Sequence, residues 1–146
     1  MSNQSVYEGL KLENQVCFPL YACSREIIKK YHPYLAKLDL TYTQYIAMMV
    51  LWQDKQVCVK DLGEKLFLDS GTLTPVLKGL ESKGLIHRSR KTEDERVVLA
   101  TITDKGMALR EEAVQIPQKV ASCVDLSMEE VMQLYSLLYK VLRTMK

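Results

Sequence analysis

The sequence predicts a mainly α-helical fold with a single small β-hairpin. Apolar residues recur at helical spacing along most of the 146 residues, two short helical segments flank a tight turn, and strand-like sequence is confined to residues 85–102. A chain of this length buries roughly 70% of its unfolded surface, so one domain can hold a core without metal or disulfide bonds. The composition, 47% hydrophobic and 26% charged, is that of a globular protein and excludes disordered and fibrous classes.

Two helices are expected at the N-terminal end. Residues 12–38 read as one long helix, and Pro33 is expected to kink or interrupt its end because proline removes a hydrogen-bond donor. Thr43 can serve as N-cap of a second helix over residues 44–53. The large apolar residues of that helix are expected to lie mostly in the core: Tyr45, Met48, Met49 and Trp52.

The middle of the chain predicts a pair of short helices joined by a tight turn. The first covers residues 59–66 and the second residues 70–82. Asp69 or Ser70 can cap the second helix, and Gly84 supplies the left-handed residue that often ends one. This arrangement matches the helix-turn-helix pattern.

A basic hairpin is expected directly after this helix pair. Residues 85–90 and 96–102 read as two strands, and the charged residues 91–95 join them. A helix-turn-helix followed by a basic hairpin is a winged helix.

The C-terminal third predicts two further helices. Thr103 caps one that runs to about residue 122, with a bend expected at Pro117, and the last helix begins with a capping box between Ser127 and Glu130. The apolar stripe of the last helix is more than the end of a small domain buries alone, so a subunit interface is expected at Val131, Leu134, Leu138, Val141 and Met145.

This order of elements defines the expected organisation. The chain forms one unit, residues 1–146, in which residues 12–42 and 104–146 supply dimerisation helices and residues 43–103 form the winged-helix DNA-binding portion. The fold class is mainly α: a winged helix-turn-helix with long N- and C-terminal helices forming a dimerisation domain.

Charge alone gives a weak indication of the partner. The net charge of +2 is too small to indicate a polyanion, but residues 78–91 carry five basic residues against one acid, Glu81. A solvated surface face is the preferred interpretation of this charge by itself, with a nucleic-acid surface as the alternative.

The four cysteines and two histidines show no zinc-ligand spacing and no C-x-x-C pair, so no metal and no other cofactor is expected. No segment approaches the roughly 18 consecutive apolar residues of a membrane span. Residues 1–9 lack the apolar stretch of a secretory signal. We therefore expect a soluble cytoplasmic protein with reduced thiols.

Several sequence strings resemble a known family. Those that resemble the MarR family of winged-helix repressors are DSGTLTPVLK at residues 69–78, LESKGLI at 80–86 and DER at 94–96. Those similar to its organic hydroperoxide resistance regulator (OhrR-like) branch are KLENQVCF at 11–18, KYHP at 30–33 and TYTQY at 41–45.

The expected DNA contacts lie on the second helix of the pair and on the hairpin. Short hydroxyl side chains in the first two turns of that helix suit the major groove, and its N-terminus suits a phosphate. The resemblance implies that the wing probes the minor groove or the backbone, and Asp94 is expected to orient Arg96. The expected DNA-binding residues are Ser70, Thr72, Thr74, Pro75, Lys78, Arg88, Arg90, Lys91 and Arg96.

The resemblance assigns redox sensing to Cys17, which on its own would be interpreted as a core residue. Because Cys17 lies several residues inside the predicted helix, the helix dipole is expected to contribute little to its thiolate. Phenolic hydroxyls can stabilise a thiolate instead. The resemblance gives that role to Tyr31 and Tyr42 from the other subunit, and Tyr21 follows Cys17 by one helical turn.

Cys123 resembles the resolving cysteine of the two-cysteine members of this branch. The resemblance implies a disulfide between Cys17 of one chain and Cys123 of the other, whereas one-cysteine members form mixed disulfides with small thiols. Cys23 and Cys58 are expected to pack in the core.

The sequence therefore predicts a homodimeric, redox-sensing transcriptional repressor that binds double-stranded DNA when reduced, and not an enzyme. Two alternatives stay open. One is a MarR-type repressor released by a small aromatic ligand without covalent change. The other is a thiol peroxidase, against which the winged helix and the missing C-x-x-C pair argue.

Overall fold

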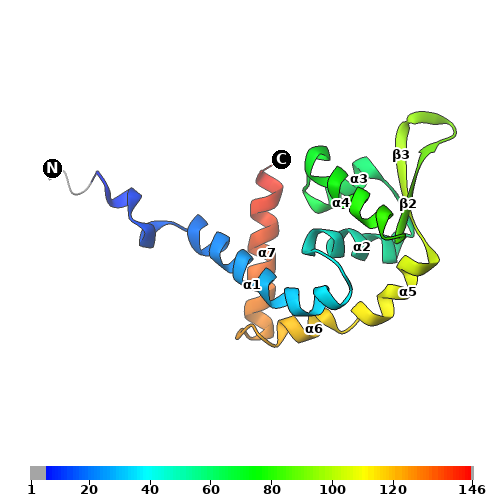
Figure 1. Cartoon of the computed structure of the whole chain (residues 1–146). Helices are drawn as coiled ribbons and strands as arrows, with labels where there is room; N and C mark the ends of the chain where they lie inside the picture. Colours follow the sequence, from blue (N-terminus) through cyan, green and yellow to red (C-terminus); the bar gives the residue numbers. More distant parts are fainter. Residues whose placement is uncertain (1–5, 146) are drawn as a thin grey trace. The chain divides into compact units, whose positions relative to one another are not determined.

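The computed structural model describes residues 6–145, and the chain divides into two compact units, Met1–Ile116 and Pro117–Lys146. Two short 3-10 turns, Glu8–Leu10 and Leu12–Asn14, precede the main elements. In chain order these are α1 (Cys17–Lys37), α2 (Tyr42–Asp54), β1 (Gln56–Cys58), α3 (Val59–Leu66), α4 (Ser70–Ser82), β2 (Ile86–Lys91), β3 (Asp94–Ile102), α5 (Asp104–Ala113), α6 (Ile116–Ala121) and α7 (Met128–Thr144) (Figure 1).

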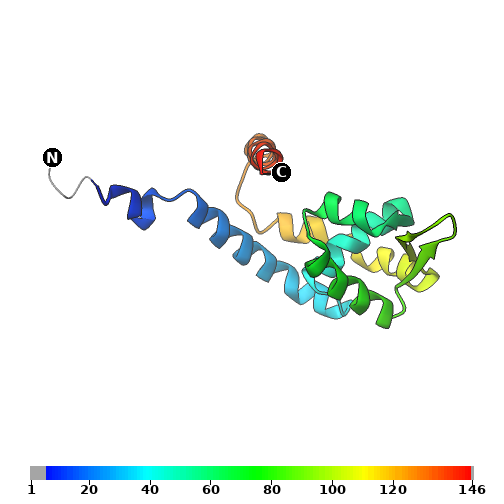
Figure 2. The ribbon, with the colours of Figure 1, turned by 90° about the horizontal axis from the view of Figure 1, so that it is seen from above.

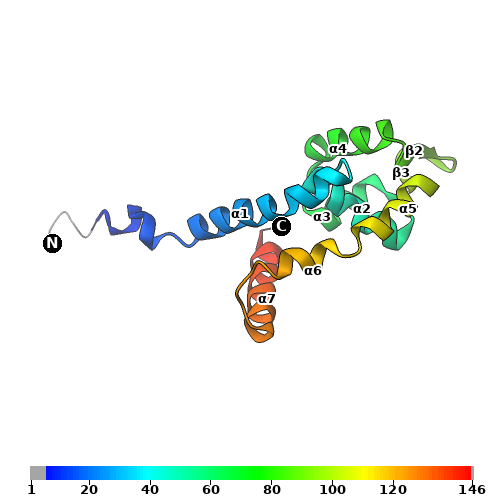
Figure 3. The same cartoon turned by 60° about the horizontal axis from the view of Figure 1, so that its bottom comes forward.

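The predicted helix-turn-helix and hairpin are confirmed. α3 and α4 have the predicted bounds, Asp69 is the N-cap of α4, and Gly84 has the expected positive φ of 73°. β2 and β3 pair antiparallel and project at one end of the first unit beside α4 (Figure 3). The structure adds β1, which pairs with β3 and gives a three-stranded sheet of order β1-β3-β2.

α1 differs from the expectation at its start and at Pro33. It begins at Cys17, because Gln15 has an extended backbone and the chain before it forms a separate 3-10 turn. Pro33 lies inside α1, which continues to Lys37, so the expected interruption is wrong. The N-terminal half of α1 extends away from the helices α2 to α5 (Figure 2). The one buried residue of α1 is Leu35, near the C-terminal end of the helix.

α2 begins two residues earlier than expected. Thr41, not Thr43, is its N-cap, and Thr41 forms a capping box with Gln44. Tyr45, Met48 and Trp52 are buried as predicted, whereas Met49 is 44% exposed, so its core assignment is wrong.

The core of the first unit lies between α2, α3 and α4. The fully buried large side chains are Tyr45, Met48, Leu51, Leu62, Leu73, Leu77 and Leu80. The Trp52 indole donates a hydrogen bond to the carbonyl of Gly106 at 2.8 Å, which joins α2 to the start of α5. The sheet and the helix-turn-helix are thus anchored to one packed centre.

The single helix expected after Thr103 is two helices. α5 ends at Ala113 and α6 begins at Ile116, with Pro117 as its second residue, where a missing backbone donor costs little. α7 begins with the predicted capping box of Ser127 and Glu130, and none of its residues is buried.

Candidate nucleic-acid interface and redox thiol

α4 presents one packed face and one polar face. Leu73, Val76, Leu77 and Leu80 are buried, and the other face carries the five predicted DNA contacts, all of them exposed or half-buried: Ser70, Thr72, Thr74, Pro75 and Lys78. The exposed face is therefore small, polar and open to a ligand, as reading a DNA groove requires.

The N-terminus of α4 is already capped by a carboxylate. Asp69 accepts a hydrogen bond from the Thr72 backbone N–H at 2.7 Å, and this bond lowers the pKa of Asp69. The Thr74 hydroxyl donates to the Ser70 carbonyl at 2.7 Å. A phosphate at Ser70 would consequently share the helix terminus with a negative charge.

The wing holds Arg96 in the expected manner. The Arg96 side chain is 91% exposed, and its Nε and backbone N–H both donate to Asp94 Oδ1 at 3.1 Å. These bonds lower the pKa of Asp94. Arg90 donates to the Glu95 carbonyl at 2.7 Å, and Lys91 pairs with Glu93 at 3.6 Å. The tip therefore displays cations on a hairpin braced by its own residues.

Arg88 has a different environment from the other wing cations. Its backbone N–H donates to Glu81 Oε2 at 2.8 Å, and its guanidinium lies 3.2 Å from Glu81 Oε1. The backbone bond and then the guanidinium lower the pKa of Glu81. Arg88 thus ties the base of β2 to α4. Sequence reasoning missed this partner, although Glu81 is the one acid in the basic run of residues 78–91.

Cys17 is exposed and is the first residue of α1. The expectation that it lies several residues inside a helix is wrong, because the chain before it does not join the helix. Backbone N–H groups of a first helical turn have no helical acceptor and favour negative charge nearby. Cys17 therefore lies at the N-terminus of α1 and not inside the helix.

Tyr31 and Tyr42 meet in a cluster of aromatic rings that also includes Tyr45. The ring centroids of Tyr31 and Tyr42 are 5.1 Å apart, and Tyr45 lies 5.7 Å from Tyr31 and 6.2 Å from Tyr42. Burial raises the pKa of all three phenols, that of Tyr45 to about 12. They are consequently neutral hydrogen-bond donors near pH 7. Tyr45 was predicted for the core alone and belongs to this cluster as well.

This tyrosine cluster cannot reach Cys17 of its own chain. Tyr31 follows Cys17 by 14 residues in α1, which at 1.5 Å per residue is about 21 Å along the helix axis. Tyr21 is one turn from Cys17, and the Arg25 guanidinium lies 5.3 Å from its ring centroid. Within one chain, Tyr21 is thus the only one of the three predicted tyrosines near the thiol.

The other cysteines are all free thiols. Cys23 is exposed, so its assignment to the core is wrong, and Cys58 is half-buried. Cys123 is exposed in the turn after α6, with its Sγ 3.7 Å from the Lys119 carbonyl.

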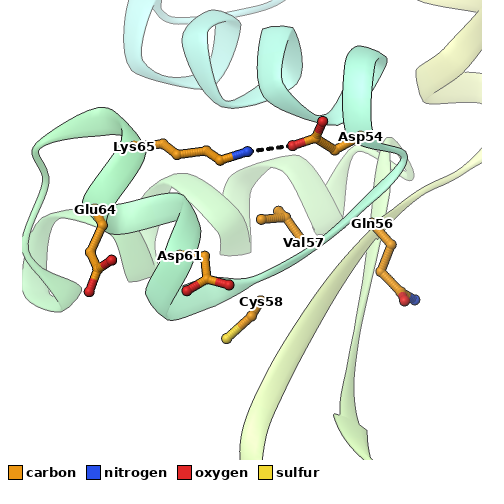
Figure 4. Close-up of a pocket in the computed structure, with 7 residues that line it drawn as sticks. All are labelled: Asp54, Gln56, Val57, Cys58, Asp61, Glu64 and Lys65. Atoms are coloured by element: carbon orange, nitrogen blue, oxygen red, sulfur yellow. Dashed lines mark hydrogen bonds and ion pairs between the residues drawn. The ribbon is translucent and has the colours of Figure 1, made fainter.

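A pocket lies between the end of α2, β1 and α3, where Cys58 is the N-cap of α3 (Figure 4). Its lining includes three carboxylates, Asp54, Asp61 and Glu64, and its one cation, Lys65, pairs with Asp54 at 2.6 Å. This charge is unsuited to DNA.

Among residues 6–145 no group of three His, Cys, Asp or Glu side chains could hold a metal ion. Over the same range no helix has the length and apolarity that a membrane crossing needs.

The helix-turn-helix, the braced basic wing and the polar face of α4 define a winged-helix protein of the DNA-binding class. A sequence model of the family described as "Transcriptional regulator SarA/Rot" matches residues 29–113. The chain belongs to the MarR family of winged-helix transcriptional regulators, in its organic hydroperoxide resistance branch.

Three relatives illustrate this membership. The organic hydroperoxide resistance transcriptional regulator of Bacillus subtilis is 49% identical over 97% of both chains. AbfR of Staphylococcus epidermidis is similar in structure. Its reduced form bound to DNA gives a TM-score of 0.78 at 31% identity and covers 98% of this chain and 99% of AbfR. Its disulfide form gives a TM-score of 0.67 at 30% identity and covers 99% of this chain and 98% of AbfR. A MarR mutant from E. coli in complex with operator DNA gives 0.75 at 27% identity, covering 87% and 93%.

Proposed function

We propose that this chain is a redox-sensing transcriptional repressor. The reduced homodimer binds a pseudo-palindromic DNA operator in the cytoplasm, and oxidation of Cys17 by an organic hydroperoxide or a related oxidant releases it. The observation that carries this proposal is the exposed Cys17 thiol at the first turn of α1, in a winged-helix chain 49% identical to a hydroperoxide resistance regulator.

DNA binding is assigned to the polar face of α4 and to the wing. α4 enters the major groove with Thr72, Thr74 and Lys78, while Arg96 follows the adjacent minor groove or backbone. Two copies related by a two-fold axis bind half-sites about 34 Å apart. Reduced AbfR and a MarR mutant from E. coli have both been solved in complex with DNA, which supports this assignment.

The chemical step takes place at sulfur. The Cys17 thiolate attacks one peroxide oxygen, the O–O bond breaks, and the departing alkoxide takes up a proton to become an alcohol. Sulfur is oxidised to a sulfenic acid. Condensation with the Cys123 thiol of the other subunit then forms a disulfide and releases water. The exposure of both thiols supports this pairing, as does the existence of AbfR in a disulfide form.

The phenols that stabilise the thiolate belong to the other subunit. This part of the proposal is supported by the separation of about 21 Å along α1 between Cys17 and Tyr31. Neutral Tyr31 and Tyr42 can then donate hydrogen bonds to a thiolate that their own chain does not supply. Oxidation replaces that acceptor and disturbs the tyrosine cluster.

The test combines mass spectrometry with DNA binding. A labelled duplex is first selected from a random-sequence library with the reduced protein. One equivalent of cumene hydroperoxide is then added, and anisotropy is recorded beside the intact mass under non-reducing conditions. We expect release of the duplex together with a covalent dimer that dithiothreitol reverses.

Three results would contradict this proposal. Release without any mass change at Cys17 would favour a repressor that responds to a non-covalent ligand. Consumption of many equivalents of peroxide per thiol would favour a peroxidase. Unchanged DNA binding after complete Cys17 oxidation would remove the switch.

A further inference from the structure

Gln44 and Lys83 connect the tyrosine cluster to α4, the helix that carries the proposed DNA contacts. We infer that these two are positioning residues, which transmit a displacement of the cluster to the C-terminal end of α4. The inference rests on the proposed function and adds the route by which oxidation changes DNA binding.

Gln44 is the one buried polar residue among the buried side chains of the described chain, at 7% exposure. Its Oε1 accepts two hydrogen bonds, from the Thr41 backbone N–H at 3.1 Å and from Lys83 Nζ at 3.0 Å. One amide oxygen therefore closes the cap of α2 and holds the side chain of the C-cap residue of α4.

Lys83 directs its ammonium group inward and away from the face of α4 proposed for DNA. Besides Gln44, Nζ donates to the backbone carbonyl of Asp39 and lies 3.7 Å from the Asp39 carboxylate. The Lys83 side chain is only 27% exposed. Its carbonyl accepts a hydrogen bond from Lys105 Nζ of α5 at 2.8 Å. The C-terminal end of α4 is thus fastened to the turn between α1 and α2.

Gly79 allows the close approach of these helices. A Cβ atom at this position would lie 2.5 Å from Gln44 Nε2, well inside van der Waals contact. The Gln44 amide consequently fits directly against the backbone of α4. A methyl group there would force the amide to move.

Two of the three clustered tyrosines lie within one helical turn of Gln44. Tyr42 and Tyr45 flank Gln44 in α2, and both rings pack against Tyr31 of α1. Asp39, which Lys83 holds, lies in the short turn between these two helices and has a positive φ of 53°. A shift of α1 against α2 therefore changes the acceptors of Lys83 and with them the seating of α4.

The experiment measures the ratio of duplex affinities before and after oxidation. Lys83→Met keeps the length of the side chain and removes its donors. We expect this variant to bind the selected duplex when reduced and to form the Cys17 sulfenic acid at the parental rate. Its ratio of affinities before and after oxidation should be about tenfold smaller than that of the parent, a change within the usual range of coupling between sites. Lys65→Met is the matched control, because it removes an ammonium group that pairs with Asp54 outside this connection.

A double-mutant cycle tests the contact with Gly79. Gly79→Ala should lower the affinity ratio in the parent but change it little in the Gln44→Ala background, where space for the methyl group exists. Thermal unfolding of each reduced variant verifies that it is folded. If Gln44→Ala does not fold, the comparison of Lys83→Met with Lys65→Met is the test of the inference.

Different outcomes overturn different claims. If the parent releases DNA on oxidation and Lys83→Met does so equally, this inference is wrong and the proposed function stands. Equal losses for Lys83→Met and Lys65→Met would also overturn it, because net charge would then be the cause. If the parent itself keeps its affinity after oxidation, the proposed function is wrong.

Discussion

The winged helix and the terminal helices contain the same kinds of apolar residue but bury them to different extents. In α4, Leu73, Leu77 and Leu80 are at most 1% exposed. In α7, Leu134 is 45% exposed and Val131 is 41% exposed, and the N-terminal half of α1 has no buried residue. The winged helix thus completes its core within one chain. The apolar faces of α7 and of the N-terminal half of α1 stay exposed in one chain.

For the proposed homodimer, this difference favours the apolar faces of α1 and α7 as the surfaces that bind a second copy. A 17-residue amphipathic helix gains most of its stability by burying its apolar face, and an exposed stripe of this size is typical of an interaction surface. The distance from Cys17 to the tyrosine cluster supports the same conclusion from the sensing chemistry. Folding and assembly should therefore respond to different substitutions, and the following predictions test this separation.

The largest effect on folding is expected inside the winged helix. Leu77→Ala removes a side chain that is 1% exposed and leaves a cavity among α2, α3 and α4, so we expect a loss of about 2–5 kcal/mol in the free energy of unfolding. Chemical denaturation of the reduced protein measures it. A loss below 0.5 kcal/mol would show that this core is not the one that stabilises the domain.

Leu134→Lys is the matched change outside the winged helix. A charge on the apolar face of α7 should convert the dimer into a monomer and weaken binding of the selected duplex roughly 100-fold, because one half-site is then contacted at a time. The far-ultraviolet circular dichroism should stay close to that of the parent. Sedimentation measures the assembly, and a variant that stays dimeric would contradict the assignment of α7 to the interface.

Arg96→Ala should have a smaller effect on DNA binding alone. Because each lost phosphate contact removes about one counterion from the salt dependence, we expect a several-fold weaker affinity and a log–log salt slope reduced by about one. Asp94 loses its partner, but the dimer and its stability should be unchanged. Equal affinities across a salt series would remove the wing from the DNA interface.

The smallest effect concerns Tyr45, at the junction of α1 and α2. Its pKa of about 12 exceeds the ordinary value of 10, so the folded state retains a proton that the unfolded state loses. This contribution to stability is complete below pH 10 and is lost as the pH rises through 12. Between pH 10 and 12 the Tm of the Tyr45→Phe variant should therefore fall less than the Tm of the parent protein. Parallel Tm curves would contradict the burial of this phenol.

Local signals were sufficient to predict α3 and α4. Asp69 caps α4 from the adjacent position and Gly84 ends it, so both signals are contained in the segment itself. The wing pair of Asp94 and Arg96 was predictable for the same reason, because the two residues are near neighbours.

Interactions between distant segments were not predictable. β1 has three residues and exists through pairing such as Val57 with Ala100, which no local pattern shows. The contact of Arg88 with Glu81 and the contact of Gln44 with Lys83 likewise depend on how separate elements pack. The start of α1 at Cys17 depended on where the preceding turn ends, which places the thiol at the helix terminus and not inside the helix.

The central claim is that oxidation of Cys17 controls DNA binding. Its most direct test is a titration of the selected duplex with the parent, Cys17→Ser and Cys123→Ser, before and after one equivalent of cumene hydroperoxide. We expect the parent to release the duplex and Cys17→Ser to remain bound. Cys123→Ser should oxidise without a cross-linked dimer and release weakly or only with an added small thiol. Release of Cys17→Ser to the same extent as the parent would contradict the account.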